Sequence, residues 1–245
     1  GAEAYNVAIG FTAGESITTA IKNTLIGGNA GDAITTGGNN TVLGYDALGA
    51  NTIGNSNVAI GKDAMKTNVA ADKNVAVGLG TLQAMTSATT LDTYNTAVGF
   101  NAGLAVTTGI QNTFMGGLAG DALTTGSNNI AIGYAALTTE DAHGRNVAIG
   151  YAALNALNAG QDAYNVAVGY RAGVDISTGV RNIMIGGDAG DALTIGNYNV
   201  AIGYKALSTS VDGDENVAIG YLALEDYEDG DGNGHNTAVG ARSQR

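Results

Sequence analysis

The side chains best suited to chemistry in this sequence lie in a run that alternates with glycine. Asp229, Asp231 and Asn233 match the first half of an EF-hand loop, whose alternating oxygen ligands suit a hard cation such as Ca²⁺. The residue at the twelfth position of such a loop would be Gly240 instead of Glu, and no flanking helices are expected. An acidic turn explains the run equally well, so calcium binding and a plain turn both stay open for this segment.

The histidines give little support for catalysis. His143 and His235 are the only two, and each lies in a turn just before a repeated Asn, with no paired nucleophile. The nearest enzymatic alternative, a hexapeptide acyltransferase, would place an aliphatic residue at every sixth position, and this sequence does not. With no Cys, thiolate chemistry and Cys-based metal sites are excluded. We therefore expect no enzymatic activity and no organic cofactor.

These turns are carried by a repeated pentapeptide, Asn-x-x-apolar-Gly. It occurs fourteen times, and ten of the thirteen intervals are 17 residues, the others being 21, 19 and 20. A short fixed period from end to end predicts a solenoid of stacked coils. The Asn residues are at positions 6, 23, 40, 57, 74, 95, 112, 129, 146, 165, 182, 199, 216 and 236.

The pentapeptide itself predicts a short strand. With the Asn as position 0, position 1 is Val, Thr or Ile, position 3 is Ile, Val, Leu or Met, and position 2 is Ala in ten coils. This β-branched alternation predicts that positions 1 and 3 face a core. The invariant Gly at position 4 suits a corner without room for a Cβ atom. The Asn either caps a turn or forms a ladder from coil to coil.

The second half of each coil supplies one large apolar residue. Position 8 is Leu or Met in seven coils and Gly in six, and wherever it is Gly, position 11 is aliphatic. Close packing requires such a constant volume. Two apolar patches separated by Gly-rich corners predict two short strands per coil. We expect an all-β, single-stranded solenoid: a parallel β-roll of about fourteen 17-residue coils.

A longer register divides the roll into blocks. The blocks are residues 6–94, 95–164 and 165–235; each opens with an Asn that follows a Tyr and closes with a lengthened coil, and a terminal coil, 236–245, follows. We expect one β-roll domain over residues 1–245. The lengthened coils, at about 74–94, 146–164 and 216–235, are expected to bulge from one side as loops.

A covariation predicts a subunit interface. Position 5 is mostly aromatic, but it is Gly in the three coils in which position 2 is Leu25, Phe114 or Met184. If position 2 points away from the core, a large residue at position 2 of one chain would pack against position 5 of a neighbouring chain, so that one is large where the other is small. Partial exposure on a monomer is the alternative. The predicted interface residues are Leu25, Val42, Phe114 and Met184 at position 2, and Phe11, Tyr45, Phe100, Tyr134, Tyr151, Tyr170, Tyr204 and Tyr221 at position 5.

Charge restricts the partners. The formal net charge is -12, from 10 basic and 22 acidic residues, which argues against binding to nucleic acid or anionic membranes. No apolar run approaches 18 residues, so we expect no membrane insertion of this segment. Thr recurs at position 12, but the ladder is broken in several coils, which argues against an ice-binding face.

The repeats resemble those of a known family. Asn-Val-Ala-Ile-Gly at 6, 57, 146 and 216, and the ending from Asn236 to Ser243, resemble the YadA-like head repeats of trimeric autotransporter adhesins. The repeats are also similar to the Asn-Thr-Ala-Val-Gly-Tyr repeats with Thr-Thr-Gly spacers of phage tail-fibre and collar-like proteins. The resemblance covers essentially the whole chain, although the 17-residue coil is longer than the usual family repeat. It implies a left-handed parallel β-roll, three chains side by side and an extracellular role in attachment.

The expected function follows from the repeat and the resemblance together. We expect an extracellular segment of a homotrimeric fibre or an adhesin head, on a bacterial surface or a virion, that attaches to a host-cell, matrix or surface receptor. The alternative is a purely structural shaft of a phage tail fibre or a surface filament, without a receptor site of its own. The membrane anchor, stalk and neck of a full adhesin are not expected in this segment.

Overall fold

The protein is an all-β molecule of very short strands. A computed structural model describes residues 3–226 and 234–244, and these ranges contain sixteen β-strands of two or three residues each and no α-helix. Within these ranges there is accordingly no helix long and apolar enough to cross a membrane. The all-β prediction is confirmed.

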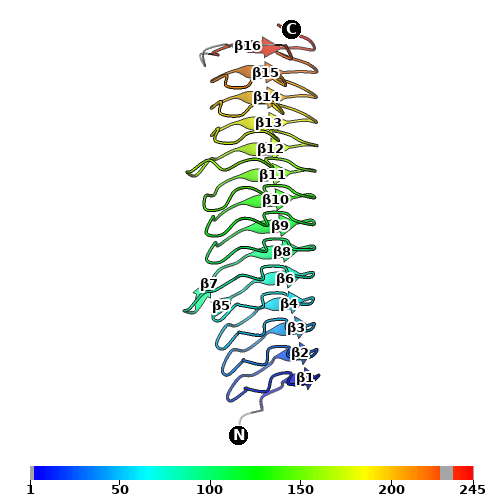
Figure 1. Cartoon of the computed structure of the whole chain (residues 1–245), viewed down its shortest axis with the longest axis vertical. Helices are drawn as coiled ribbons and strands as arrows, with labels where there is room; N and C mark the ends of the chain where they lie inside the picture. Colours follow the sequence, from blue (N-terminus) through cyan, green and yellow to red (C-terminus); the bar gives the residue numbers. More distant parts are fainter. Residues whose placement is uncertain (1–2, 227–233, 245) are drawn as a thin grey trace. The chain divides into compact units, whose positions relative to one another are not determined.

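The chain forms two compact units, residues 1–125 and 126–245. In each unit, parallel strands lie next to one another in chain order (Figure 1). Unit 1 contains β1 (Val7–Ile9), β2 (Thr24–Ile26), β3 (Thr41–Leu43), β4 (Val58–Ile60), β6 (Val75–Val77), β8 (Thr96–Val98) and β9 (Thr113–Met115). Unit 2 contains β10 (Ile130–Ile132), β11 (Val147–Ile149), β12 (Val166–Val168), β13 (Ile183–Ile185), β14 (Val200–Ile202), β15 (Val217–Ile219) and β16 (Thr237–Val239).

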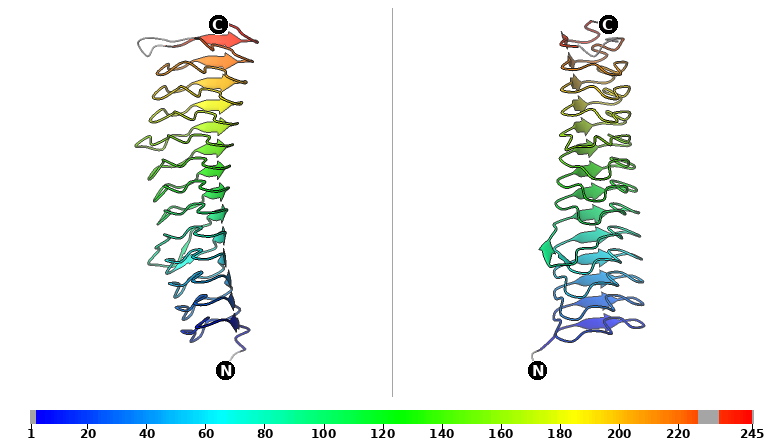
Figure 2. Two further views of the ribbon diagram at one scale, coloured as in Figure 1. Left: turned by 45° about the vertical axis from the view of Figure 1, so that its right-hand side comes forward. Right: turned by 60° about the vertical axis from the view of Figure 1, so that its left-hand side comes forward.

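The strands keep one register throughout each unit. Val147 pairs with Val166 and Ala148 with Ala167, although a lengthened coil of 19 residues separates these strands. The additional residues are therefore accommodated outside the strand. Figure 2 shows that the strands form one side of the coils, and that the other residues of each coil loop back behind them. Each unit is a parallel β-solenoid, as the repeat predicts.

The Gly at position 4 forms a corner after each strand. Gly169, for example, has a φ of +146°, a conformation that side chains rarely adopt. A Cβ atom there would also overlap the carbonyl oxygen of Gly186 in the next coil. The prediction of a corner that excludes Cβ is confirmed.

The Asn side chains form a buried ladder. The Oδ1 atom of Asn182 accepts the backbone N–H of Asn199 at 2.9 Å, and its Nδ2 donates to the carbonyl oxygen of Gly196 at 2.7 Å. Asn165 holds the backbone N–H of Asn182 in the same way, at 2.8 Å. The ladder interpretation of the Asn is thus confirmed, and the same amides also satisfy the backbone of the turn.

The prediction of which strand residues face the core is wrong. Position 2 is buried in every coil except the first, where Ala8 is exposed, whereas positions 1 and 3 are exposed or half-buried, as Thr41, Leu43 and Val239 show. The physical reason is space. The interior of the coil is thin, and the Leu or Met at position 8 already fills most of it, so Ala suits the inner position and the larger β-branched residues point outward.

The second half of most coils consists of turns and not of a second strand. Position 8 has a left-handed conformation even where it is not Gly: Leu154 has a φ of 49° and is fully buried. The prediction of two strands per coil is therefore wrong for most coils. Unit 1 provides one exception, where β5 (Ala71–Asp72) pairs with β7 (Leu91–Asp92) on the lengthened coil after β6. This pair projects from the side of unit 1 (Figure 2).

Candidate interaction surface

The outward side of the strands is an apolar surface in each unit. Ile183 and Ile185 of β13 are 37% and 38% exposed, and Met115 of β9 is 45% exposed. Positions 1 and 3 carry no charged residue in any of the fourteen coils. We call these two columns of side chains the outer strand face. Position 3 is apolar in every coil, and position 1 is Val, Ile or, in five coils, Thr. An extended apolar stripe such as that of position 3 is uncommon on a monomer.

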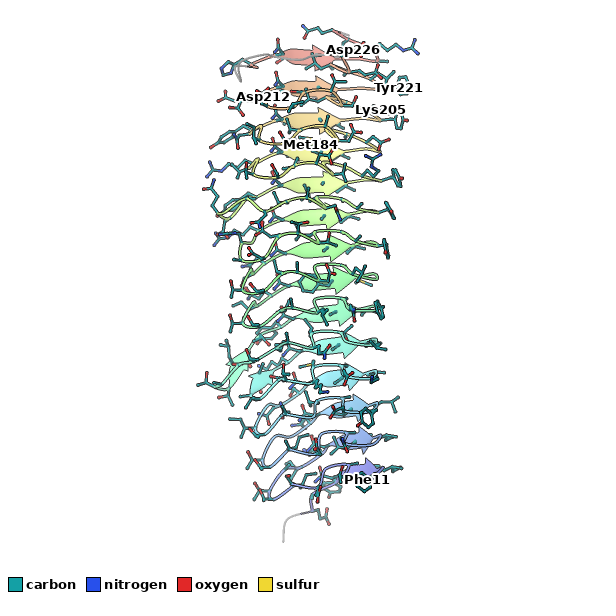
Figure 3. The ribbon with its side chains drawn as sticks, in the orientation of Figure 1. Phe11, Met184, Lys205, Asp212, Tyr221 and Asp226 are labelled. Carbon is teal, nitrogen blue, oxygen red and sulfur yellow. The ribbon has the colours of Figure 1, made fainter. Side chains whose placement is uncertain are left out.

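A column of aromatic side chains at position 5 follows the Gly corners. In unit 2 the rings of Tyr134 and Tyr151 stack at 5.8 Å between centroids, Tyr151 and Tyr170 at 5.3 Å, and Tyr204 and Tyr221 at 5.8 Å. Figure 3 shows Tyr221 projecting from the outer edge of its coil. The aromatic residues predicted for the interface are exposed: Phe11, Tyr45, Phe100, Tyr134, Tyr151, Tyr170, Tyr204 and Tyr221.

The four position-2 residues predicted for the interface are instead core residues. Leu25, Val42, Phe114 and Met184 are 0% exposed within the chain itself. A side chain in that place cannot reach a neighbouring chain, so this part of the interface prediction is wrong.

The covariation that suggested the interface arises inside the coil. A Cβ atom at Gly103 would lie 2.8 Å from the Phe114 ring, and one at Gly120 would overlap that ring. Met184 occupies the space beside Gly190 in the same manner. Position 2 thus exchanges volume with position 8, and the pairing of positions 2 and 5 no longer supports an intersubunit contact.

A second exposed column lies just before each Asn, and in four successive coils of unit 2 it consists of Arg145, Tyr164, Arg181 and Tyr198. The guanidinium of Arg145 lies 5.3 Å from the Tyr164 ring centroid, and that of Arg181 lies 6.0 Å from Tyr164 and 5.2 Å from Tyr198. Sequence reasoning missed this cation–π ladder. The signal was the recurrence of Arg and Tyr at the residue before the Asn.

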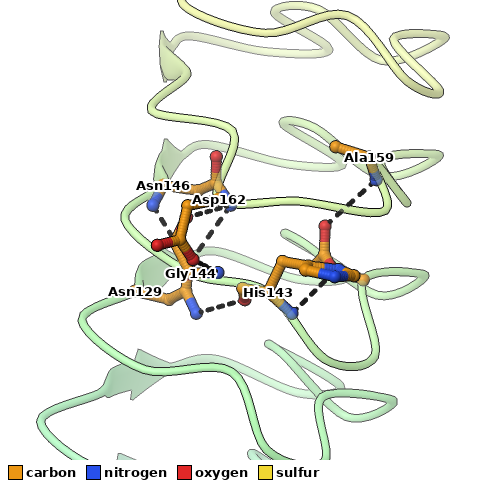
Figure 4. A network of polar contacts seen from close by, with 7 residues as sticks. Asn129, His143, Gly144, Asn146, Ala159 and Asp162 are labelled. Carbon is orange, nitrogen blue, oxygen red and sulfur yellow. Dashed lines mark hydrogen bonds and ion pairs between the residues drawn. The ribbon is translucent and has the colours of Figure 1, made fainter.

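The histidines lie in structural networks. The buried Glu140 accepts the backbone N–H of His143 at 3.0 Å and contacts its ring Nδ1 at 3.1 Å. Figure 4 shows this turn beside Asn129, whose Nδ2 donates to the carbonyl oxygen of His143. Glu140, Asp141 and His143 bring three potential metal-ligand atoms within 4.8 Å. Since the Glu140 carboxylate already caps the turn, we assign this cluster a structural role.

The predicted calcium ligands Asp229, Asp231 and Asn233 lie outside the described residues. One coil earlier, the Asp214 carboxylate is used structurally. Its Oδ1 accepts the backbone N–H of Asn197 at 2.6 Å. Calcium binding by the 229–233 segment stays a prediction.

Three equivalent aspartates are partly buried without full hydrogen bonding. Asp32, Asp121 and Asp191 each have one carboxylate oxygen without a hydrogen-bond partner. Burial raises the pKa of all three above the ordinary value of 3.8. Asp32 also lines a hollow of about 260 Å³ in unit 1, where Lys66 pairs with Asp46 at 2.7 Å. Burial therefore destabilises the ionised form of each carboxyl group relative to its protonated form in the folded state.

Replacing one of these aspartates is expected to stabilise the protein at neutral pH. Burial raises the pKa of Asp121 in the folded state, so its stabilising contribution is present at acid pH and is lost as the pH rises through that pKa. Asp121→Asn should raise the unfolding midpoint at pH 7, and this advantage should shrink as the pH falls through the raised pKa of the folded state and vanish below the ordinary carboxyl pKa. Thermal denaturation at several pH values measures this, with the exposed Asp175→Asn as control. An advantage that is independent of pH would contradict the prediction.

Comparison with protein-family models, with curated proteins and with solved structures found no match in any of the three.

Proposed function

We propose that the protein is an extracellular, homotrimeric fibre segment or adhesin head whose chains associate through the outer strand face. The observation that carries this proposal is the absence of charge from positions 1 and 3, which leaves an apolar column at position 3 and a column of Val, Ile and Thr at position 1 exposed or half-buried along the strands. The centre of a protein interface is likewise depleted of charge. The three-chain arrangement and a left-handed roll come from the resemblance to YadA-like head repeats.

The mechanism of such a segment is scaffolding and repeated display. The Asn ladder and the parallel strand pairing join each coil to the next within a unit. Three copies of a weak surface site would gain avidity of about 10²–10⁴ from simultaneous binding. A purely structural shaft would use the same scaffold, and binding of the isolated protein to a host cell or matrix component would favour the adhesin over the shaft.

Association through the outer strand face predicts a mass near three times 24.3 kDa. Light scattering coupled to size exclusion measures it. Ile185→Asp would place a carboxylate in the interface, because Ile185 points outward from β13, and it should release folded monomers. The matched control is Thr178→Asp, at an exposed position away from the strands, which should stay assembled. A wild-type monomer, or an Ile185→Asp variant that keeps the wild-type mass, would argue against this interface.

A further inference from the structure

Two exposed columns of unit 2 can be compared over the same three coils, which begin at Asn165, Asn182 and Asn199. In the column before each Asn, Arg181 lies between Tyr164 and Tyr198, 6.0 and 5.2 Å from their ring centroids. In the column at position 5, the corresponding residues are Tyr170, Gly187 and Tyr204. One column thus contains a cation between two rings, and the other contains two rings with no side chain between them.

The rings of Tyr170 and Tyr204 flank Gly187, and no stacked ring lies between them in the described residues. Tyr151 stacks on the opposite side of Tyr170 at 5.3 Å, and Tyr221 stacks on the opposite side of Tyr204 at 5.8 Å. Tyr170 and Tyr204 are 56% and 48% exposed. Strands of successive coils lie about 4.8 Å apart. Tyr170 and Tyr204 are two coils apart, and the tyrosines on either side of Arg181 are separated by the same number of coils.

Neither the backbone nor packing requires a glycine at this place. Gly187 does not have a left-handed φ, and a Cβ atom there would come no nearer than 3.5 Å to another side chain, an ordinary contact with Tyr204. Tyr151 occupies the equivalent place two coils earlier, with stacked rings on both sides. The fold would therefore accept a larger residue at position 187, and the absence of a side chain there is a feature of this surface.

We propose that the space over Gly187, between Tyr170 and Tyr204, binds a compact organic cation, either a guanidinium or a quaternary ammonium group. Aromatic faces attract such cations, and the chain already fills the neighbouring column with Arg181. A net charge of -12 favours the approach of a cation over that of an anion. We assign the ligand group to an arginine side chain of a partner protein, because the chain itself places a guanidinium, that of Arg181, between two tyrosine rings. A choline-type headgroup is the other outcome that the test distinguishes. Phe11, Gly28 and Tyr45 repeat the pattern in unit 1.

The chain's own lysine next to this site gives an additional expectation. The Nζ atom of Lys205 lies 5.9 Å from the Tyr204 ring centroid, so it is the cation that a ligand would displace or approach. Lys205→Met should therefore strengthen the binding of an organic cation. This inference goes beyond the proposed function and does not depend on how many chains associate.

The test is a titration of the intact protein with tetramethylammonium, choline, guanidinium and methyl glucoside, followed by saturation-transfer NMR and calorimetry. The cations should bind and the neutral sugar should not. A double variant, Gly28→Tyr and Gly187→Tyr, should weaken cation binding at least roughly tenfold because the added rings occupy the two spaces. Preference for choline or for guanidinium distinguishes the two sources of the ligand group.

A gain-of-site variant provides the matched control. Tyr151→Gly would leave Tyr134 and Tyr170 flanking an open space, so it should add one cation site per chain. Tyr204→Leu, which removes one wall at an exposed position, should weaken binding without changing the thermal unfolding midpoint appreciably. Absence of cation binding by the wild type, equal binding by the double variant, or preference for the sugar would overturn the proposal. Light scattering on the same samples separates a loss of binding from a loss of association.

Discussion

Phe114→Ala should destabilise unit 1 by about 3–5 kcal/mol, the usual range when a fully buried aromatic ring is removed. Phe114 is 0% exposed and fills the space beside two glycines, Gly103 in the preceding coil and Gly120 in its own. Neither glycine has a side chain that could move into the vacated volume. Urea denaturation followed by circular dichroism measures the loss, and the exposed Phe100→Ala in the preceding coil should cost far less.

A second substitution in the same coil should restore part of this stability. With Ala at 114 and Leu at 120, position 11 still holds Leu123, and the coil then matches the one that contains Ala148, Leu154 and Leu157. Leu154 shows that a buried Leu adopts the left-handed conformation that position 8 requires. The double variant Phe114→Ala/Gly120→Leu should recover roughly half of the lost free energy, whereas Gly120→Leu alone should destabilise.

The same site separates the core role of Phe114 from an interface role. Phe114→Asp would bury a carboxylate in an apolar interior, so it should reduce the β-type circular dichroism of the protein. A residue that contacted a neighbouring chain would, in contrast, release folded monomers on the same substitution. Folded monomers of Phe114→Asp, or a fully additive effect of the two substitutions at 114 and 120, would contradict the packing seen in unit 1.

The repeat predicts most of the backbone but not the direction of the side chains. The 17-residue spacing and the invariant Gly predict stacked coils and left-handed corners, because both depend on local conformation, as Gly169 illustrates. An alternation with a period of two indicates only that neighbouring residues face opposite sides of the strand, not which side is the core. In Val-Ala-Ile the larger residues suggested the inner side, although in these coils the inner side holds the Ala and the larger residues point outward. The exchange between Phe114 and Gly120 was the sequence signal that could have fixed the correct side.

Surface chemistry was predictable only in part. The exposed tyrosines of position 5 could be found by their type and spacing, but stacked rings and the sandwiching of Arg181 depend on distances between coils. The buried Glu140 could not be found, because its equivalents in other coils are Asn, Ser or aliphatic residues. Its burial follows from the turn that it caps, not from a pattern in the repeat.

The largest polar effect is expected from the Asn ladder. Asn182→Ala leaves the backbone N–H of Asn199 and the carbonyl oxygen of Gly196 without their side-chain partner in a fully buried place. An unsatisfied buried group costs about 1–3 kcal/mol, so the variant should lose roughly 2–5 kcal/mol. Denaturant unfolding measures this loss in unit 2. The exposed Asn158→Ala is the matched control and should be nearly neutral.

An isosteric substitution tests whether hydrogen bonding, and not volume, is responsible. Asn182→Asp keeps the acceptor for Asn199 but turns the donor toward Gly196 into a second acceptor, in a site that disfavours charge. Burial should raise the pKa of that carboxyl in the folded state, so the stability of the variant should fall as the pH rises through this pKa. At acid pH the protonated carboxyl can donate to Gly196, and the deficit relative to wild type should shrink. A deficit of the same size at every pH would mean that the ladder acts by filling space, because a cavity or a strained side chain does not titrate.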